Sequence, residues 1–122
     1  MSDNQRKWYV LRTIGGKEKK VKEYIENEVA NSGLQEFVSQ VLIPTEKVYQ
    51  IRNGKKVAKE RNFFPGYVLV EAALVGEIAH MLRNITNVIG FLGDTKGLLR
   101  PQIAYNQQIA YNTIKTNLIE KI

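Results

Sequence analysis

Cysteine is absent from this chain of 122 residues, which excludes disulfides, thiol nucleophiles and cysteine-ligated metal sites. Histidine occurs only once, at His80, with no nucleophile at the spacing of a catalytic motif. No apolar run approaches the roughly 20 residues that cross a bilayer, and the polar first residues lack the apolar region of a signal peptide. We therefore expect a cytoplasmic protein with no membrane partner, metal ion or cofactor.

Recognisable catalytic constellations are missing as well. No companion residue that would define acid–base or metal chemistry accompanies the glutamate pairs Glu26–Glu28 and Glu71–Glu77. The glycine pair at 15–16, followed by Lys17, is too short for a phosphate-binding loop. These absences predict that the protein is not an enzyme.

Positive charge is concentrated in one short segment. The net charge of the chain is +6, and residues 47–61, with six cations and one anion, carry +5 of it. Such a concentration favours a polyanion such as nucleic acid as a neighbour. Lysines also keep exposed sheet edges soluble, so the charge alone leaves both interpretations open. The candidate nucleic-acid-proximal residues are Arg52, Lys55, Lys56, Lys59 and Arg61.

The same segment is predicted to form a β-hairpin. Asn53-Gly54 joins two β-prone runs, and a type I′ turn requires a positive φ at both of its central residues. A two-residue turn sets the register, with Arg52 opposite Lys55 and Tyr49 opposite Ala58. Neither face is cleanly apolar near the tip, so we expect the distal half to project into solvent.

An aromatic corner follows the hairpin, with the sequence Phe63-Phe64-Pro65-Gly66-Tyr67, and leads into a β-branched strand. Pro65 fixes its own φ and keeps Phe64 extended, while Gly66 can take the positive φ of a type II turn. Rings on so stiff a corner lose little entropy when a partner covers them. An isolated aromatic cluster is otherwise more typical of a protein core.

The remaining pattern predicts an α+β fold. Strands are expected at 8–13, 37–43, 67–73 and 88–92. A first helix, supported by Glu18 and Lys22 at i, i+4, is expected to end near Gly33, and a short second helix lies around 75–82. This order indicates a mainly antiparallel four-stranded sheet of ferredoxin-like type, with two helices on one face and a projecting basic hairpin.

The two ends of the chain are predicted separately. Residues 1–6 are expected to be a disordered tail, and residues 7–122 a single domain. A third helix is expected at about 106–121, because Ala110, Ile114, Leu118 and Ile122 form one helical stripe. Packing against the sheet is the role that we expect for this helix.

Taken together, these motifs resemble the N-terminal domain of NusG, a bacterial transcription elongation factor. The resemblance covers residues 7 to about 95, in the order and spacing of the family. Its matching segments are residues 7–10, 16–21, 41–48, 51–55, 60–61, 63–70 and 90–93. The residues after about 96 match the final helix of the family poorly.

The resemblance implies a domain that binds the clamp helices of the largest subunit of RNA polymerase. Such a domain bridges the cleft near the upstream DNA and modulates elongation, pausing, termination and antitermination. The implied polymerase-binding residues are Phe64, Pro65, Gly66 and Tyr67, with Arg12 at the rim. The implied docking surface requires the rings of Phe64 and Tyr67 to be uncovered in the lone domain, whereas Phe63 is expected to be core.

One feature of the family, a C-terminal KOW domain, has no counterpart in the pattern. No glycine-rich KOW pattern follows the domain, so a contact with Rho or a ribosomal protein is expected only if a KOW domain exists elsewhere in the protein. A specialised, operon-specific member of the family is one alternative, but the intact Phe-Phe-Pro-Gly-Tyr-Val-Leu-Val run favours the general factor. A stand-alone RNA-binding module is the other alternative, although the strand carries Leu69 where such a module needs an aromatic side chain.

Overall fold

The computed structural model describes residues 6–62, 64–95 and 99–120, with the backbone but not the side chains at 46–48, 60–62 and 117–120. The expected disordered tail lies outside the described residues, except for Arg6, whose guanidinium donates a hydrogen bond to the Glu36 carbonyl over 3.0 Å. The predicted core position Phe63 also lies outside them. The strands are β1 (Lys7–Thr13), β2 (Val38–Leu42), β3 (Thr45–Arg52), β4 (Lys55–Asn62), β5 (Tyr67–Ala72) and β6 (Val88–Phe91), and the helices are α1 (Glu18–Ser32), α2 (Ile78–Arg83) and α3 (Gln107–Glu120).

Four of these strands form one antiparallel sheet in the order β2-β5-β1-β6. The two central strands, β1 and β5, pair from Lys7 opposite Ala72 to Arg12 opposite Tyr67. Beyond the end of β6, the chain returns to the edge of β1, where Trp8 and Ala104 exchange two backbone hydrogen bonds of 2.8 Å. The α+β fold expected from the sequence is confirmed, with element ends within three residues of the expected ones.

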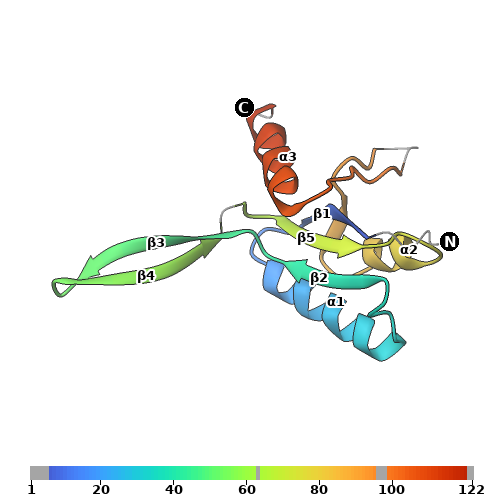
Figure 1. Ribbon diagram of the computed structural model, residues 1–122, viewed down its shortest axis with the longest axis horizontal. Helices are drawn as coiled ribbons and strands as arrows, with labels where there is room; N and C mark the ends of the chain where they lie inside the picture. The colour runs from blue at the N-terminus through green and yellow to red at the C-terminus, as the bar shows by residue number, and fades with distance from the viewer. Residues whose placement is uncertain (1–5, 63, 96–98, 121–122) are drawn as a thin grey trace.

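The helices α1 and α2 cover one face of this sheet (Figure 1). On α1, Val21, Ile25 and Val29 are buried at helical spacing, and the helix ends at Gly33, whose φ of 67° is left-handed. Tyr9 and Phe91 from the sheet meet in this layer edge to face, with 5.8 Å between ring centroids, and burial raises the pKa of the Tyr9 hydroxyl. The first core cluster therefore lies between the two helices and the sheet.

The third helix packs on the opposite face of the sheet (Figure 1). Its Ala110 and Ile114 are both fully buried, against Trp8, Val10 and Leu69 of the strands. The Asn106 side chain caps the helix by accepting a hydrogen bond of 2.9 Å from the Ile109 amide. The expected third helix and its packing are confirmed, although Leu118 and Ile122 lie outside the described side chains.

The strands β3 and β4 form a separate two-stranded sheet that projects from the body (Figure 1). Asn53 and Gly54 have φ values of 52° and 77°, as the predicted type I′ turn requires. The register also agrees with the prediction, with Arg52 opposite Lys55 and Tyr49 opposite Ala58. Every side chain from Tyr49 to Lys59 is exposed, so the expectation of a solvent-projecting hairpin is confirmed.

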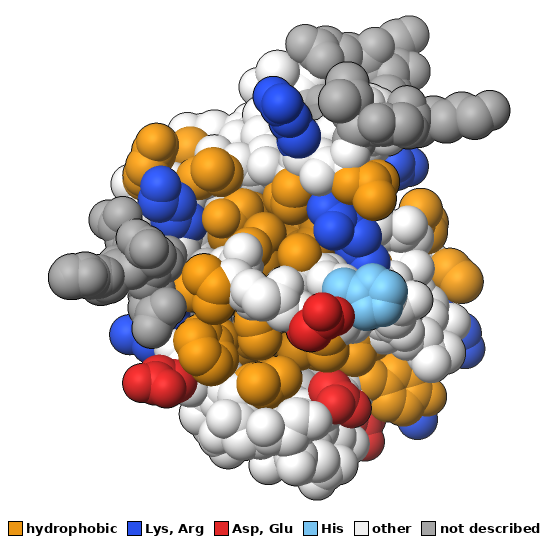
Figure 2. All heavy atoms as spheres, turned by 90° about the vertical axis from the view of Figure 1, so that its right-hand side faces the viewer, with side chains coloured by type: hydrophobic (Ala, Val, Ile, Leu, Met, Phe, Trp, Pro, Cys, Tyr) orange, Lys and Arg blue, Asp and Glu red, His pale blue; other side chains and the backbone are white. Residues whose placement is uncertain are grey.

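The end of the domain that faces away from the hairpin is partly apolar. Figure 2 shows hydrophobic side chains gathered at this end between acidic and basic ones. A hollow of about 370 Å³ opens beside α2, and Phe37, Ile78 and Met81 are among the residues that line it. The side chain of His80 is exposed.

Candidate functional site

The aromatic corner has the turn conformation that its sequence predicts. Gly66 has a φ of 87°, and the Tyr67 amide donates a hydrogen bond of 3.3 Å to the Phe64 carbonyl across the turn. In another hydrogen bond of the corner, the Gly66 carbonyl accepts from the Thr13 amide, at the end of β1, over 2.8 Å. The corner is therefore joined to the central strand β1 as well as to β5, which begins at Tyr67.

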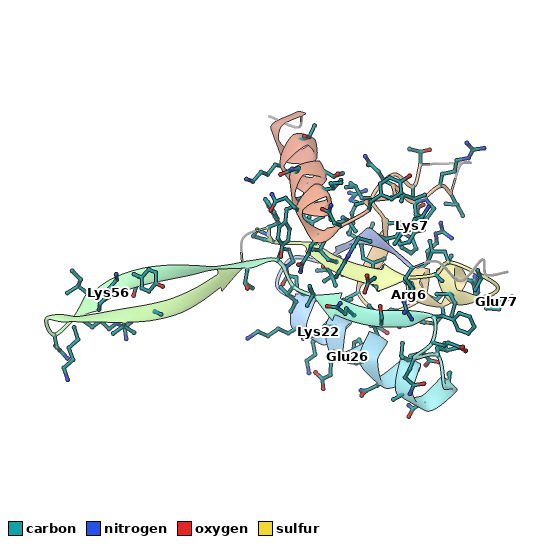
Figure 3. The ribbon with its side chains drawn as sticks, viewed as in Figure 1. Arg6, Lys7, Lys22, Glu26, Lys56 and Glu77 are labelled. Carbon is teal, nitrogen blue, oxygen red and sulfur yellow. The ribbon has the colours of Figure 1, made fainter. Side chains whose placement is uncertain are left out.

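A carboxylate holds the same turn from the other side. Glu18, the first residue of α1, is only 5% exposed, and its Oε2 accepts a 2.6 Å hydrogen bond from the Gly66 amide. The same oxygen accepts a longer one, of 3.3 Å, from the Gly16 amide. The expected pairing of Glu18 with Lys22 is wrong, because the Glu18 carboxylate is turned toward the corner. Lys22 instead lies 4.0 Å from Glu26, one turn further along α1 (Figure 3).

The rings of the corner are covered rather than exposed. Phe64 is 4% exposed and Tyr67 is 6% exposed, both within the cluster beneath α3. The ring of Tyr111 on α3 stands 6.2 Å from that of Phe64, centroid to centroid. The expectation that both rings are uncovered in the lone domain is therefore wrong. The physical reason is that α3 buries its own apolar side chains on this face of the sheet, and the rings fill the same layer.

The other two predicted corner residues and Arg12 reach solvent. Pro65 is exposed and Gly66 is half-buried at the tip of the turn. Arg12 is half-buried on β1, opposite Tyr67 on one side and Gly90 on the other. Arg12 follows Trp8 and Val10 at every second position of β1, so the three side chains lie on the same face of the sheet, which is the face that α3 covers. The structure thus brings Arg12 and the corner together at one end of that face.

The predicted cationic residues lie together along the hairpin. Arg52 and Lys55 flank the turn, opposite each other, and Lys59 lies further along the same hairpin face, opposite Val48. Lys56 is on the other hairpin face, with its Nζ 4.6 Å from the centroid of the Tyr49 ring (Figure 3). Arg61 pairs with Glu46 at the base of the hairpin in the backbone register, and its side chain is outside the described ones.

Other kinds of site find no support in the described parts of the chain. No group of three or more His, Asp or Glu side chains is placed to hold a metal ion there. None of the helices within those parts is long and apolar enough to span a membrane.

Comparison with known proteins decides the family. The family model described as transcription termination factor NusG matches residues 6–108. The chain belongs to the NusG family. The transcription termination/antitermination protein NusG of Neisseria meningitidis serogroup B is 34% identical over 113 residues, which are 93% of this chain and 64% of that protein. The Bacillus subtilis protein of the same description is 37% identical over 97 residues, 80% of this chain and 55% of that protein.

A solved structure of Thermotoga maritima NusG agrees in fold. Its TM-score is 0.64 at 30% identity, over 84% of this chain and 52% of the other. The chain thus spans between about half and two thirds of the length of these NusG relatives. Family membership also weighs against the alternative of a stand-alone RNA-binding module. In addition, Leu69, on the same face of β5 as Tyr67, is aliphatic where such a module needs a second aromatic side chain.

Sequence reasoning did not find the contact between Glu18 and the corner. Glu18 and Gly66 are 48 positions apart, and nothing local in either segment indicates the hydrogen bond between them. The position of Glu18 in the first turn of a helix already explains an acidic residue there, because the helix dipole favours negative charge at its N-terminus. The hydrogen bond that Glu18 accepts from the Gly66 amide is evident only from the tertiary structure.

Proposed function

We propose that this domain is a non-enzymatic, cytoplasmic transcription elongation factor of the general NusG type, which binds the clamp helices of RNA polymerase. The family match over residues 6–108 carries this proposal. The docking surface is the α3 face of the sheet at the corner of Phe64, Pro65, Gly66 and Tyr67, with Arg12 at its rim. Contacts with Rho or a ribosomal protein belong to a protein that also carries a KOW domain.

Docking on the two rings requires α3 to move. Phe64 and Tyr67 are almost fully buried in the cluster that includes Ala110 and Ile114 of α3, so a partner helix that packs on these rings takes the place of α3. Among the described side chains of α3, Ala110 and Ile114 are buried on this face, and the ring of Tyr111 packs beside that of Phe64. Burying one isoleucine side chain is worth about 1.5–3 kcal/mol, an amount that a clamp helix packing on the same rings can replace. The proposed sequence is therefore displacement of α3 followed by docking.

The hairpin is assigned to the DNA at the upstream edge of the transcription bubble. It projects from the body at the corner, so a domain seated on polymerase by the corner extends the hairpin away from its docking surface. Its exposed cations suit phosphate groups, and the exposed Tyr49 and Ile51 give its other face an apolar component. In this arrangement one surface binds polymerase and another lies against the nucleic acid.

The polymerase contact is tested by changing the rings without opening large cavities. Phe64→Leu with Tyr67→Leu removes two aromatic anchors, and we expect the affinity for core RNA polymerase to fall at least about tenfold. The matched control is Tyr9→Leu with Phe91→Leu, which removes a Tyr and a Phe from the core on the other face. Fluorescence anisotropy measures the affinity and urea unfolding the stability. Equal affinities for the two double variants would contradict the assignment of the corner.

If α3 must be displaced before docking, a variant in which α3 packs more weakly should bind polymerase more tightly. Ile114→Ala weakens the packing of α3 by about 2–5 kcal/mol and so lowers the cost of uncovering the rings. Because apparent affinity scales with the fraction of the competent state, we expect polymerase to bind this variant at least about tenfold more tightly. The control is Ile109→Ala on the same helix, where the side chain is 40% exposed. Unchanged or weaker binding of Ile114→Ala relative to Ile109→Ala would show that α3 stays in place.

The assignment of the hairpin to DNA is tested by removing positive charge from it. We expect the triple variant Lys55→Gln, Lys56→Gln and Lys59→Gln to bind duplex DNA more weakly at low salt. The slope of log affinity against log salt should flatten by up to about 0.9 per lost phosphate contact. The control replaces Lys17, Lys19 and Lys20, which line a hollow beside α1, and removes the same charge from the body. The nucleic-acid role is abandoned if the hairpin variant keeps both the affinity and the slope of the unchanged protein.

A further inference from the structure

Glu18 is a buried acidic residue whose acceptor oxygen serves a turn far away in the chain. A glutamate in the first turn of a helix usually keeps its charge in water, since ionised side chains are seldom buried without partners. Here the side chain is nearly inaccessible, and its Oε2 accepts hydrogen bonds from the amides of Gly16 and Gly66. The 2.6 Å separation at Gly66 is short for an N–H to carboxylate bond, as charge-assisted hydrogen bonds are.

The contact fixes the one residue of the corner whose conformation is least restricted. Pro65 has a locked φ, but glycine loses more conformational freedom on folding than any other residue. Gly66 takes a φ of 87°, its carbonyl is held by Thr13, and its amide is held by Glu18. With both polar groups of Gly66 engaged, the directions in which Phe64 and Tyr67 leave the turn are set.

Glu18 holds the corner from the side of the sheet that α3 does not cover. Glu18 belongs to α1, which covers one face of the sheet, whereas α3 covers the other (Figure 1). A movement of α3 therefore leaves the hydrogen bonds of Glu18 in place. The corner then keeps its shape once uncovered, and a partner does not have to order it, which lowers the cost of association.

We propose that Glu18 is a positioning residue that holds the Phe64–Tyr67 corner in its polymerase-binding conformation. This inference rests on the proposed function, because it assigns a role within that docking surface. It differs from a purely local role in starting α1, since a local role predicts no effect on Gly66 or on polymerase.

The test compares two substitutions of similar size that differ in hydrogen bonding. Glu18→Gln keeps an acceptor oxygen, whereas Glu18→Met fills nearly the same space without one. The control is Glu23→Met, which removes the same charge from an exposed position on the same helix. Two quantities are measured on the full chain, the hydrogen-exchange rate of the Gly66 amide by NMR and the affinity for core RNA polymerase.

We expect Glu18→Met to lose the protection of the Gly66 amide and to bind polymerase about tenfold more weakly. Glu18→Gln should retain part of the protection, and its affinity should lie between those of Glu18→Met and the unchanged protein. Glu23→Met should match the unchanged protein in both quantities. If Glu18→Met does not fold, Glu18→Gln alone decides. Faster Gly66 exchange with weaker binding supports the role, and unchanged values overturn it.

The outcomes separate this inference from the proposed function. Unchanged polymerase affinity in Glu18→Met, with reduced affinity in Phe64→Leu/Tyr67→Leu, overturns the role of Glu18 and leaves the docking surface intact. Undiminished affinity in Phe64→Leu/Tyr67→Leu overturns the docking surface itself, and with it the part that Glu18 plays in binding.

Discussion

The rest of the structure depends on the burial of β5 on both of its faces. Val68, Val70 and Ala72 point into the layer beneath α1 and α2, and Tyr67 and Leu69 point into the layer beneath α3, with none of them more than 6% exposed. A strand with two apolar faces needs a cover on each side, because neither row of side chains can be left in water without cost. The corner sits at the beginning of this strand, so the rings that the proposed function assigns to polymerase are also part of the core beneath α3. Under the proposed function, binding and folding would therefore use the same apolar surface.

The hairpin is subject to a different constraint. Its two strands pair only with each other, and its described side chains are exposed from Tyr49 to Lys59. The ladder and the Asn53-Gly54 turn therefore stabilise it with little help from a core, and its charges remain available. Like charges opposite each other at Arg52 and Lys55 weaken the ladder near its tip, which is a cost that a bound polyanion would relieve.

Local rules were sufficient for much of the fold and for part of the site. The hairpin register followed from a two-residue turn, and α1 followed from the helical spacing of Val21, Ile25 and Val29. The burial of Phe64 and Tyr67 did not follow, because the periodicity of α3 says that it has an apolar side but not which residues that side meets. The role of Glu18 was equally hidden, since its partner Gly66 is brought to it only by the fold. Long-range contacts of this kind carry no local pattern.

The most direct test of the central claim is site-specific photo-crosslinking to core RNA polymerase from position 65, the exposed residue of the corner. A photoreactive residue in place of Pro65 should crosslink to the clamp helices of the largest subunit. The same group in place of Asn27, exposed on α1, should give little crosslinking to these helices. Equal yields from the two positions, or crosslinks from position 65 only to other parts of polymerase, would contradict docking through the corner.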